Sequence, residues 1–497
     1  MLKSSYFICF LFKYFVSGYA ERPSVIIVGG GAAGIAAATK LLENSFTNIT
    51  ILEAENRIGG RIHSVKFGDG VVNLGAEYCF GMKGNIVYEL AKKYNILEPA
   101  VTTFENNVYY SDGSKLDSLI TRDLDALLGK VYLKKYGNNN TIQTSGGDVV
   151  IERYNSTILP KYENDSSKIQ ILREGFRFCD GYVTLYDAVR SWFDVSADSD
   201  FEGADEMLVW KNIGYRIIID ILIRSYPDPR KKLDIDGKIH LNKSVQKIIW
   251  DADQTVTVLT ADNSSYSSDY VILTQSVGVL KEQKDTLFDP KLPLSKERAI
   301  VDSGYGSIGR IVLKFSTKWW RDDEQLFSFF WSDKDWGTIN SSDGLTKNGL
   351  SWIVQIREMM KLPGISNVWA IWISGDFLSE IETLPDNILK SGIQYVLNKF
   401  LGKTHNVTEI RDILKTTWTT NENFRGTSSY LKTGKYKSDD PVQRRLARPV
   451  RNSEGKLKLL FAGEATHSTL YTTVQGAIES GYREAERIIK LCNKSEQ

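Results

Sequence analysis

Short runs of apolar residues, separated by glycine and polar residues, define the first predicted elements of the chain. Val25–Val28 and Ile49–Leu52 are short and largely apolar, which is typical of parallel strands buried on both faces. Between them, Ala32–Leu42 is rich in small residues and predicts a helix. The order strand, helix, strand predicts a βαβ unit in this part of the chain.

Similar runs continue to the end of the chain and predict two sheets. The further predicted strands are Ile239–Ile249, Thr255–Thr260, Tyr270–Thr274, Gly309–Phe315, Leu350–Gln355, Val368–Ser374 and Leu457–Phe461. We expect the strands at Gly309, Leu350 and Val368 to belong to a different sheet from the βαβ unit. Two further helices are predicted, Gly214–Arg224 and Thr473–Leu491.

The first twenty residues follow another pattern. Lys3 precedes the apolar runs Tyr6–Phe12 and Tyr14–Val16, and Gly18 and Ala20 are small residues in the positions expected before a cleavage site. Residues 1–20 therefore predict a secretory signal peptide, since an uncleaved membrane anchor needs a longer apolar run. Nine Asn-x-Ser/Thr sites also favour secretion: Asn48, Asn139, Asn155, Asn164, Asn242, Asn263, Asn340, Asn406 and Asn493.

Composition and charge exclude several classes of protein. The chain has 62 Lys and Arg against 61 Asp and Glu, and no basic run, which argues against a nucleic-acid partner. With four histidines and no Cys/His cluster of ligand spacing, we expect no metal site. After cleavage three cysteines remain, Cys79, Cys179 and Cys492. This odd number leaves at least one free thiol or an intermolecular bridge, and no disulfide framework is indicated. We also expect no stable membrane span, and the sequence does not indicate the oligomeric state.

A glycine motif connects the first strand to the first helix. Gly29, Gly31 and Gly34 form the pattern Gly-x-Gly-x-x-Gly, which gives a tight turn, room for a pyrophosphate and close packing of helix on strand. The helix that follows presents free N–H groups to the phosphates. Glu53 ends the second strand, 19 residues after Gly34, where an acid accepts the ribose hydroxyls and disfavours NADP.

A second glycine loop follows Glu53, and its sequence favours FAD over NAD as the bound dinucleotide. The segment Leu52–Arg61 contains Ala54 and the sequence Gly59-Gly60-Arg61, in which the arginine supplies two donors to a phosphate. This extended motif resembles the FAD-dependent amine oxidase superfamily. Other segments are similar to its polyamine and spermine oxidase branch: Val72–Tyr78, Lys243–Val245, Tyr270–Leu280, Trp418, Phe424–Gly426 and Phe461–His467.

The resemblance implies an amine oxidase fold of the α/β class, α+β overall. It has a discontinuous Rossmann-type FAD-binding domain, predicted at residues 21–100, 235–290 and 445–497. A mixed-sheet and helical substrate domain is predicted at residues 101–234 and 291–444. The residues expected to hold FAD are Gly29, Gly31, Ala33, Gly34, Glu53, Ala54, Gly60, Arg61, Gly75, Ala76, Glu77, Val245, Trp418, Glu464, Thr473 and Val474. FAD is expected to be non-covalent, because the loop Arg425–Tyr430 has no cysteine.

The implied activity is oxidation of a small amine, with O₂ as the second substrate and H₂O₂ as a product. Three positions depart from the polyamine oxidase pattern. Arg310 stands in place of the lysine that holds a water at flavin N5, so Arg310 is the expected catalytic residue. Phe80 replaces a His or Glu, and Ser428 replaces an aromatic residue of the substrate cage. With Tyr430 these two are the candidate substrate contacts.

Those departures leave three interpretations open. The first is an active polyamine-type oxidase whose substrate preference has shifted. The second is a secreted L-amino-acid oxidase, and the third is a secreted FAD-containing binding protein with little or no turnover. The polyamine-type oxidase is favoured, because the internal motifs are more similar to that branch.

Overall fold

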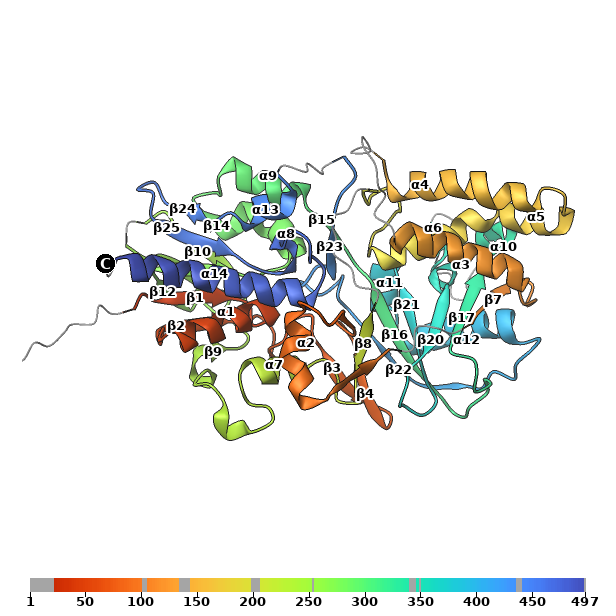
Figure 1. Ribbon diagram of the computed structural model, residues 1–497, viewed down its shortest axis with the longest axis horizontal. Helices are drawn as coiled ribbons and strands as arrows, with labels where there is room; N and C mark the ends of the chain where they lie inside the picture. The colour runs from red at the N-terminus through yellow and green to blue at the C-terminus, as the bar shows by residue number, and fades with distance from the viewer. Residues whose placement is uncertain are drawn as a thin grey trace, which may run out of the picture.

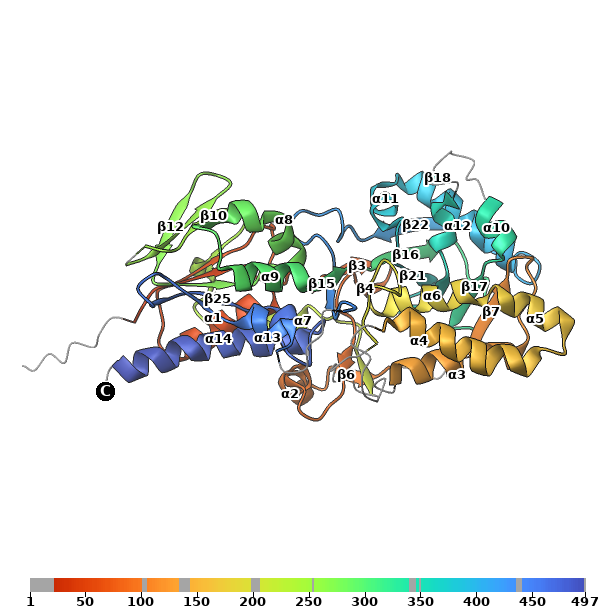
Figure 2. The same ribbon diagram turned by 90° about the horizontal axis from the view of Figure 1, so that it is seen from above.

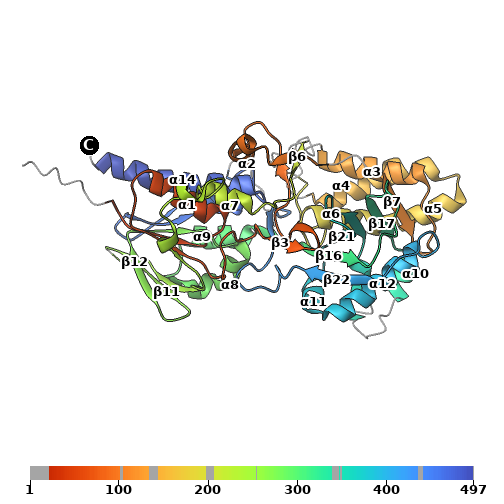
Figure 3. The same ribbon diagram turned by 90° about the horizontal axis from the view of Figure 1, so that it is seen from below.

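The molecule is elongated and divides into two halves that lie side by side (Figures 1, 2 and 3). This is a computed structural model. It describes residues 22–100, 105–133, 144–197, 206–252, 254–338, 346–347, 350–434 and 440–495. The predicted signal peptide, residues 1–20, lies outside the described residues.

A six-stranded sheet forms the centre of one half. Its order is β24-β25-β13-β1-β2-β9, so its neighbours come from the start, middle and end of the chain. The strands are β1 (Val25–Val28), β2 (Ile49–Leu52), β9 (Ile239–His240), β13 (Tyr270–Leu273), β24 (Val450–Arg451) and β25 (Leu457–Phe461). All pairs are parallel except β24 with β25. Both faces are covered, which explains why Val25–Val28 is apolar at every position and buried throughout.

Helices cover one face of this sheet. They are α1 (Ala32–Glu43), α2 (Ile86–Ala91), α7 (Ile217–Leu222) and α14 (Val474–Ser495). α1 and α14 lie along each other (Figure 1). A Cβ atom on Gly481 would lie 2.2 Å from the carbonyl oxygen of Ala33, so the two backbones nearly touch. The small residues of α1 are what permit this packing.

The other face is covered by a four-stranded sheet of order β12-β11-β10-β14 and by two helices. These elements are β10 (Val245–Ile249), β11 (Val256–Thr260), β12 (Ser265–Ser268), β14 (Phe288–Asp289), α8 (Val277–Leu287) and α9 (Leu294–Asp302). Together with the parallel sheet they form a layered α/β domain of the Rossmann type.

The second half is built on another six-stranded sheet, of order β22-β16-β21-β20-β17-β7. The strands are β7 (Asn106–Tyr110), β16 (Gly309–Phe315), β17 (Leu326–Phe330), β20 (Glu358–Lys361), β21 (Val368–Ile373) and β22 (Ile410–Lys415). Only β7 with β17 is parallel among the described pairs of this sheet. Its helices are α3 (Ser118–Leu133), α4 (Gly146–Arg153), α5 (Ser166–Arg173), α6 (Gly175–Tyr186), α10 (Asp333–Thr338), α11 (Leu378–Thr383) and α12 (Asp386–Leu401).

Small sheets, most of which lie where the two halves meet, and short helices complete the chain (Figure 2). The small sheets contain β3 (Ser64–Phe67), β4 (Gly70–Asn73), β5 (Cys79–Phe80), β6 (Leu97–Pro99), β8 (Met207–Trp210), β15 (Gly304–Gly306), β18 (Thr346–Lys347), β19 (Leu350–Ser351) and β23 (Ser428–Tyr430). The remaining α-helix is α13 (Val442–Ala447). Short 3₁₀ and π segments are Lys92–Tyr94, Tyr154–Ile158, Leu159–Tyr162, Pro229–Lys231, Asp236–Lys238, Trp352–Gln355 and Glu464–Thr466. None of the described helices is both long and apolar enough to cross a membrane.

The predicted βαβ unit, the α/β fold class and the separate second sheet are confirmed. Two predicted elements are wrong. Leu350–Gln355 is not one strand, because Trp352–Gln355 is a buried 3₁₀ helix, and an apolar run without alternation does not distinguish the two. Ile239–Ile249 is two strands in different sheets, because Asn242 and Lys243 turn away to donate backbone hydrogen bonds to Glu55 and Glu53.

The predicted helix Gly214–Arg224 is shorter than expected, since positive φ angles at both of its ends restrict it to Ile217–Leu222. The predicted domain boundaries stay a prediction.

Candidate active site

A long cavity of about 330 Å³ begins where β1 meets α1 and extends into the region between the two halves. Except for Gly34 and Tyr430, every residue predicted for the site lines it. From the predicted cofactor set these are Gly29, Gly31, Ala33, Glu53, Ala54, Gly60, Arg61, Gly75, Ala76, Glu77, Val245, Trp418, Glu464, Thr473 and Val474. Arg310, Phe80 and Ser428 line it too.

The turn after β1 requires glycine for two separate reasons. Gly29 has φ +108°, and a Cβ atom there would lie 2.3 Å from Oγ1 of Thr274. Gly34 lies inside α1, where a Cβ atom would lie 2.0 Å from the carbonyl oxygen of Gly29. Gly34 therefore does not touch the cavity, but it lets the helix pack directly on the turn that shapes the cavity wall.

The N-terminus of α1 is open toward the cavity. Gly31 is its N-cap and supplies no side-chain hydrogen bond, and the first turn has no acidic residue. Ala32 and Ala33 line the cavity beside it. The first N–H groups of a helix have no partner within the helix, so they and the helix dipole form a site for an anionic group.

Glu53 is fixed at the end of β2, with 6% of its surface exposed. Its Oε2 accepts the N–H of Gly30 at 2.6 Å and its Oε1 accepts the N–H of Glu55 at 2.8 Å. Burial raises the pKa of this carboxyl above its ordinary value, and those two hydrogen bonds act in the opposite direction. Each oxygen keeps a lone pair that faces the cavity and suits a sugar hydroxyl.

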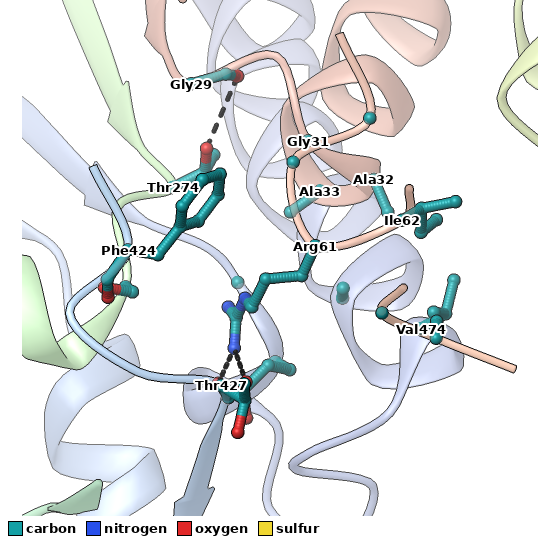
Figure 4. Close-up of a pocket in the computed structure, with 18 of the residues that line it drawn as sticks. Gly29, Gly31, Ala32, Ala33, Arg61, Ile62, Thr274, Phe424, Thr427 and Val474 are labelled. Carbon is teal, nitrogen blue, oxygen red and sulfur yellow. Dashed lines mark hydrogen bonds and ion pairs between the residues drawn. The ribbon is translucent and has the colours of Figure 1, made fainter. Parts of the chain in front are cut away.

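The second glycine loop lies against the first. The N–H of Gly59 donates to the carbonyl of Gly30 at 2.9 Å, and a Cβ atom on Gly60 would lie 3.2 Å from Cα of Gly31. Arg61 then extends toward Thr427, as Figure 4 shows. One of its nitrogens, Nη1, donates to the carbonyl of Thr427 at 2.6 Å and to Oε1 of Glu464 at 2.9 Å. The rest of its guanidinium remains available to an anionic ligand.

Glu464 holds this corner together. Its Oε2 accepts hydrogen bonds from the hydroxyl of Ser429 at 2.5 Å and from the N–H of Thr472 at 2.7 Å, and 4% of the residue is exposed. The carboxylate is therefore fully committed to the protein. It positions Arg61 and the segment that leads into α14.

The far end of the cavity is formed by Trp418 and by the start of α14. The indole of Trp418 donates to the carbonyl of Leu74 at 2.8 Å, which fixes the strand before Gly75. The hydroxyl of Thr473 accepts the N–H of Gly476 at 2.9 Å and so caps α14. Val474, the first residue of this helix, lines the cavity in Figure 4, and the positive end of the helix dipole lies beside it.

Arg310 lies on β16 with 2% of its surface exposed. Its Nη2 donates to Oε1 of Glu77 at 2.9 Å, and its Nη1 donates to the carbonyl of Asn73. The guanidinium carbon lies 4.5 Å from the ring centre of Trp372, the residue opposite Arg310 on β21. An ion pair and an aromatic face therefore hold the guanidinium in one position.

The three candidate substrate contacts differ in position. Phe80 lines the cavity, is 40% exposed, and has its ring 6.2 Å from that of Tyr78. Ser428 also lines the cavity, on β23. The structure does not bring Tyr430 to the cavity wall, because its ring packs on Gly304 and against the core below α3 to α6.

Several cavity residues were not predicted. Thr274 and Gln275 lie within the segment Tyr270–Leu280 and could have been found there. The sequence around Trp372 does not indicate that this residue lines the cavity, because its position depends on which residue of β16 it lies opposite. Gln283, Thr427 and Tyr215 also line the cavity and come from three different elements or loops.

Buried polar atoms without partners test whether the cavity fits a large polar cofactor. Among the described residues that line it, four side-chain atoms are buried and have no hydrogen-bond partner: Oε2 of Glu77, Oε1 of Gln275, Oε1 of Gln283 and Nε of Arg310. Such atoms are uncommon in native proteins and are satisfied when a ligand is bound. Together with the open helix end and Glu53, they fit a dinucleotide. In the part of the chain that the structure describes, no group of three or more His, Cys, Asp or Glu residues suits a metal ion.

Fold and site together define a dinucleotide-binding protein whose cavity extends beyond the nucleotide. A model of the family described as flavin containing amine oxidoreductase matches residues 32–489. The chain belongs to this family, whose members contain a flavin, and it is an oxidoreductase that is similar to polyamine oxidases.

Named relatives match over nearly the whole chain. A human protein named peroxisomal N(1)-acetyl-spermine/spermidine oxidase is 28% identical over 94% of this chain and 95% of its own. Polyamine oxidase 1 of Zea mays is 29% identical, over 95% of this chain and 91% of its own. Protein anon-37Cs of Drosophila melanogaster is 26% identical, over 96% and 92%.

Proposed function

We propose that this protein oxidises a polyamine-type amine with non-covalently bound FAD and releases H₂O₂. The observation that carries the proposal is one continuous cavity. This cavity connects the glycine loops and Glu53 to a buried ion pair, Arg310 with Glu77. Four buried polar atoms of its described lining residues have no hydrogen-bond partner.

Each part of FAD has a suitable place. Glu53 suits the ribose hydroxyls, while the N-terminus of α1 and the guanidinium of Arg61 suit the pyrophosphate. Val245 lies where the resemblance expects the adenine, and the start of α14 suits the flavin ring. No cysteine is present among the described cavity-lining residues, which supports non-covalent binding. When bound, FAD accepts a hydride from the carbon next to the amine nitrogen and passes the electrons to O₂.

The protein's own groups then position the amine. Glu77 lines the cavity beside Arg310, and its Oε2 is buried without a hydrogen-bond partner in the described structure. We propose that Arg310 organises charge and water at the reacting end, and that an amine arriving without its proton needs no further base. Phe80 and Ser428 provide the variable walls that set which amine fits.

We also propose that the protein is secreted after removal of residues 1–20. The sequence pattern of that segment supports this, and so does the exposure of seven sequon asparagines: Asn48, Asn155, Asn164, Asn242, Asn263, Asn406 and Asn493. Asn139 and Asn340 lie outside the described residues.

An anaerobic titration of the purified protein with spermine, an N-acetylated polyamine and a set of L-amino acids tests the activity. Bleaching of the oxidised flavin by a polyamine is the expected result, followed by H₂O₂ formation when air is admitted. Bleaching by amino acids alone would contradict the polyamine assignment and support an L-amino-acid oxidase.

A second candidate function is FAD binding without useful turnover. It is favoured by one observation: Nη1 and Nη2 of Arg310 already donate to Asn73 and Glu77. Two of the five N–H groups of the guanidinium are therefore already engaged by the protein, which leaves fewer of them for a water at the reacting end. If no amine reduces the wild-type flavin but a polyamine reduces that of Arg310→Lys, this second function describes the natural protein better.

A further inference from the structure

Away from the flavin cavity, two adjoining surface grooves lie along the outer side of α14. They measure about 520 Å³ and about 470 Å³, and they share Pro449, Glu479, Arg483 and Arg487. Their other wall is α13 and the segment that follows it, and Figures 1 and 2 both show α13 beside α14. The short helix Glu464–Thr466 separates this side from the cavity.

Cationic side chains outnumber acidic ones along the grooves, and three of these cations, Arg448, Arg483 and Arg487, are paired with the acids Asp440 and Glu484 behind the lining. Among the described residues, six cationic side chains line them: Arg444, Arg448, Arg451, Arg483, Arg487 and Lys490. Only two lining residues of the same part of the chain are acidic, Glu479 and Glu486. The formal charge of the whole chain is +1, so this is a local accumulation that the overall composition does not show.

The two walls contribute cations in a regular way. Arg483, Arg487 and Lys490 are spaced four and three residues apart, which puts them on one face of α14. Arg444 and Arg448 are likewise four residues apart on the opposite wall, at α13. A linear ligand lying in the grooves would therefore meet positive charge on both sides along its length.

Some of these cations have donors to spare. Arg444 is exposed, and no hydrogen bond or ion pair involves its guanidinium in the described structure. Arg451 donates from Nη1 to the carbonyl of Gly455, at the surface. Lys490 is 75% exposed in its side chain and lies 3.8 Å from Glu486, beyond hydrogen-bond distance.

Arg483 and Arg487 have a different role, as parts of the groove floor. The guanidinium of Arg483 donates to the carbonyls of Thr466 and Phe461 at 3.0 and 2.8 Å, and Nε of both arginines pairs with buried Glu484. They are held in place before any ligand arrives, which lowers the entropic cost of binding.

We propose that these grooves bind a sulfated polysaccharide chain. Five of the six cations are arginines, whose planar guanidinium matches the oxygens of a sulfate group in pairs. The concave shape suits an extended chain and not a flat lipid surface. Nucleic-acid bases would need open aromatic faces, and the tyrosine of the grooves, Tyr482, packs against the core with Lys40 over its ring. The proposal does not depend on the oxidase activity.

Heparin binding to the full-length, flavin-loaded protein tests this. The variant Arg444→Gln/Arg451→Gln/Lys490→Gln removes three exposed cations without touching the buried Glu484 pairs. It should weaken heparin binding by about tenfold or more at moderate salt, since each lost cation removes a salt-sensitive contact. The matched control is Lys66→Gln/Arg122→Gln/Lys403→Gln, which removes three exposed cations on other elements and should leave the affinity unchanged. Flavin content and melting temperature report whether each variant is folded.

Four outcomes would overturn the proposal. The groove variant binds heparin as tightly as wild type, or the control variant loses as much affinity. Heparin from which the sulfates have been removed binds equally well. Single-stranded DNA binds as tightly as heparin and is lost in the groove variant, which would mark the grooves as a nucleic-acid site.

Discussion

Single residues decide how charge is distributed in the flavin cavity. Arg310 carries a permanently charged, planar group, and Glu77 lies 2.9 Å away as its counter-charge. Both side chains are mostly withdrawn from water, at 2% and 14% exposure. A buried pair of this kind is costly to form but far more costly to break, so the two residues act as one unit.

Removing the cation alone should therefore destabilise the protein. Arg310→Met leaves Glu77 buried without its partner, and we expect the free energy of unfolding to fall by about 3–5 kcal/mol. Adding Glu77→Gln to that variant should recover part of the loss. Denaturant unfolding of the two single variants and the double variant measures the coupling. Additive effects would show that the pair does not act as a unit.

The ribose contact is a second prediction at this scale. Glu53→Ala removes a fixed, buried carboxylate, and we expect FAD binding to weaken by about 1.5–3 kcal/mol. Fluorescence titration of the apoprotein with FAD measures this. Glu43→Ala, which removes a carboxylate of an exposed ion pair on the same βαβ unit, should bind FAD like wild type. Unchanged affinity in Glu53→Ala would mean that the nucleotide lies elsewhere.

At the scale of elements, the sequence predicted those helices and strands whose ends are marked by glycines or by the limits of an apolar run. The β1–α1 unit was predictable because two requirements for glycine are local: Gly29 has φ +108°, and Gly34 packs on the carbonyl oxygen of Gly29. The 3₁₀ helix at Trp352 was not, because all four of its residues are buried and neither period is visible. The position of Trp372 over Arg310 depends on the register of β16 and β21, which no local pattern contains.

The packing of α1 on its preceding turn gives a third prediction. In Gly34→Ala the new Cβ atom would lie 2.0 Å from a backbone oxygen, so a side-chain adjustment does not relieve the clash. We expect the variant to be purified without flavin or to be insoluble. Gly237→Ala, where nothing lies within 4 Å of the new atom, is the control and should be yellow and soluble. A flavin-loaded Gly34→Ala protein would contradict this account of the turn.

Strand β20 carries a pH-sensitive carboxyl, which is the fourth prediction. Burial, helped by the charge of Asp125, raises the pKa of Glu358 to about 7. Between the ordinary carboxyl value and pH 7 the folded state holds more protons than the unfolded chain, so stability falls as pH rises. The melting temperature of wild type should drop more between about pH 5 and about pH 8 than that of Glu358→Gln. Equal drops would show that Glu358 ionises normally.

At the scale of the whole molecule, the flavin cavity is formed by segments that are far apart in the sequence. Nearly every residue that the motifs predicted lines the cofactor cavity, since each motif has its own local signature, although many of the other lining residues were not predicted. The cationic grooves could not be predicted as grooves. The sequence contains the arginine-rich stretch 444–451, but Arg444 and Arg487 become neighbours only after α13 and α14 have packed on the sheet.

Export of the protein is the fifth prediction. Expressed in a eukaryotic host, it should appear in the medium with Glu21 as its first residue, because Ala20 and Gly18 suit a signal peptidase. Mass spectrometry should find glycan on several of the seven exposed sequon asparagines. A cell-retained protein that begins at Met1 and has no glycan would overturn the proposed secretion.

The strand order of the parallel sheet also constrains when the protein can become functional during its synthesis. β1 is translated early, yet its neighbour β13 comes much later, and the next strand, β25, leaves the ribosome near the end of the described chain. Until then the edge of β13 has no β25 to pair with, and the small-residue face of α1 has no α14 to pack against. Nascent chains must therefore be protected from aggregation over most of translation. We expect FAD to bind only after α14 has been synthesised, because the start of this helix forms part of the cavity wall.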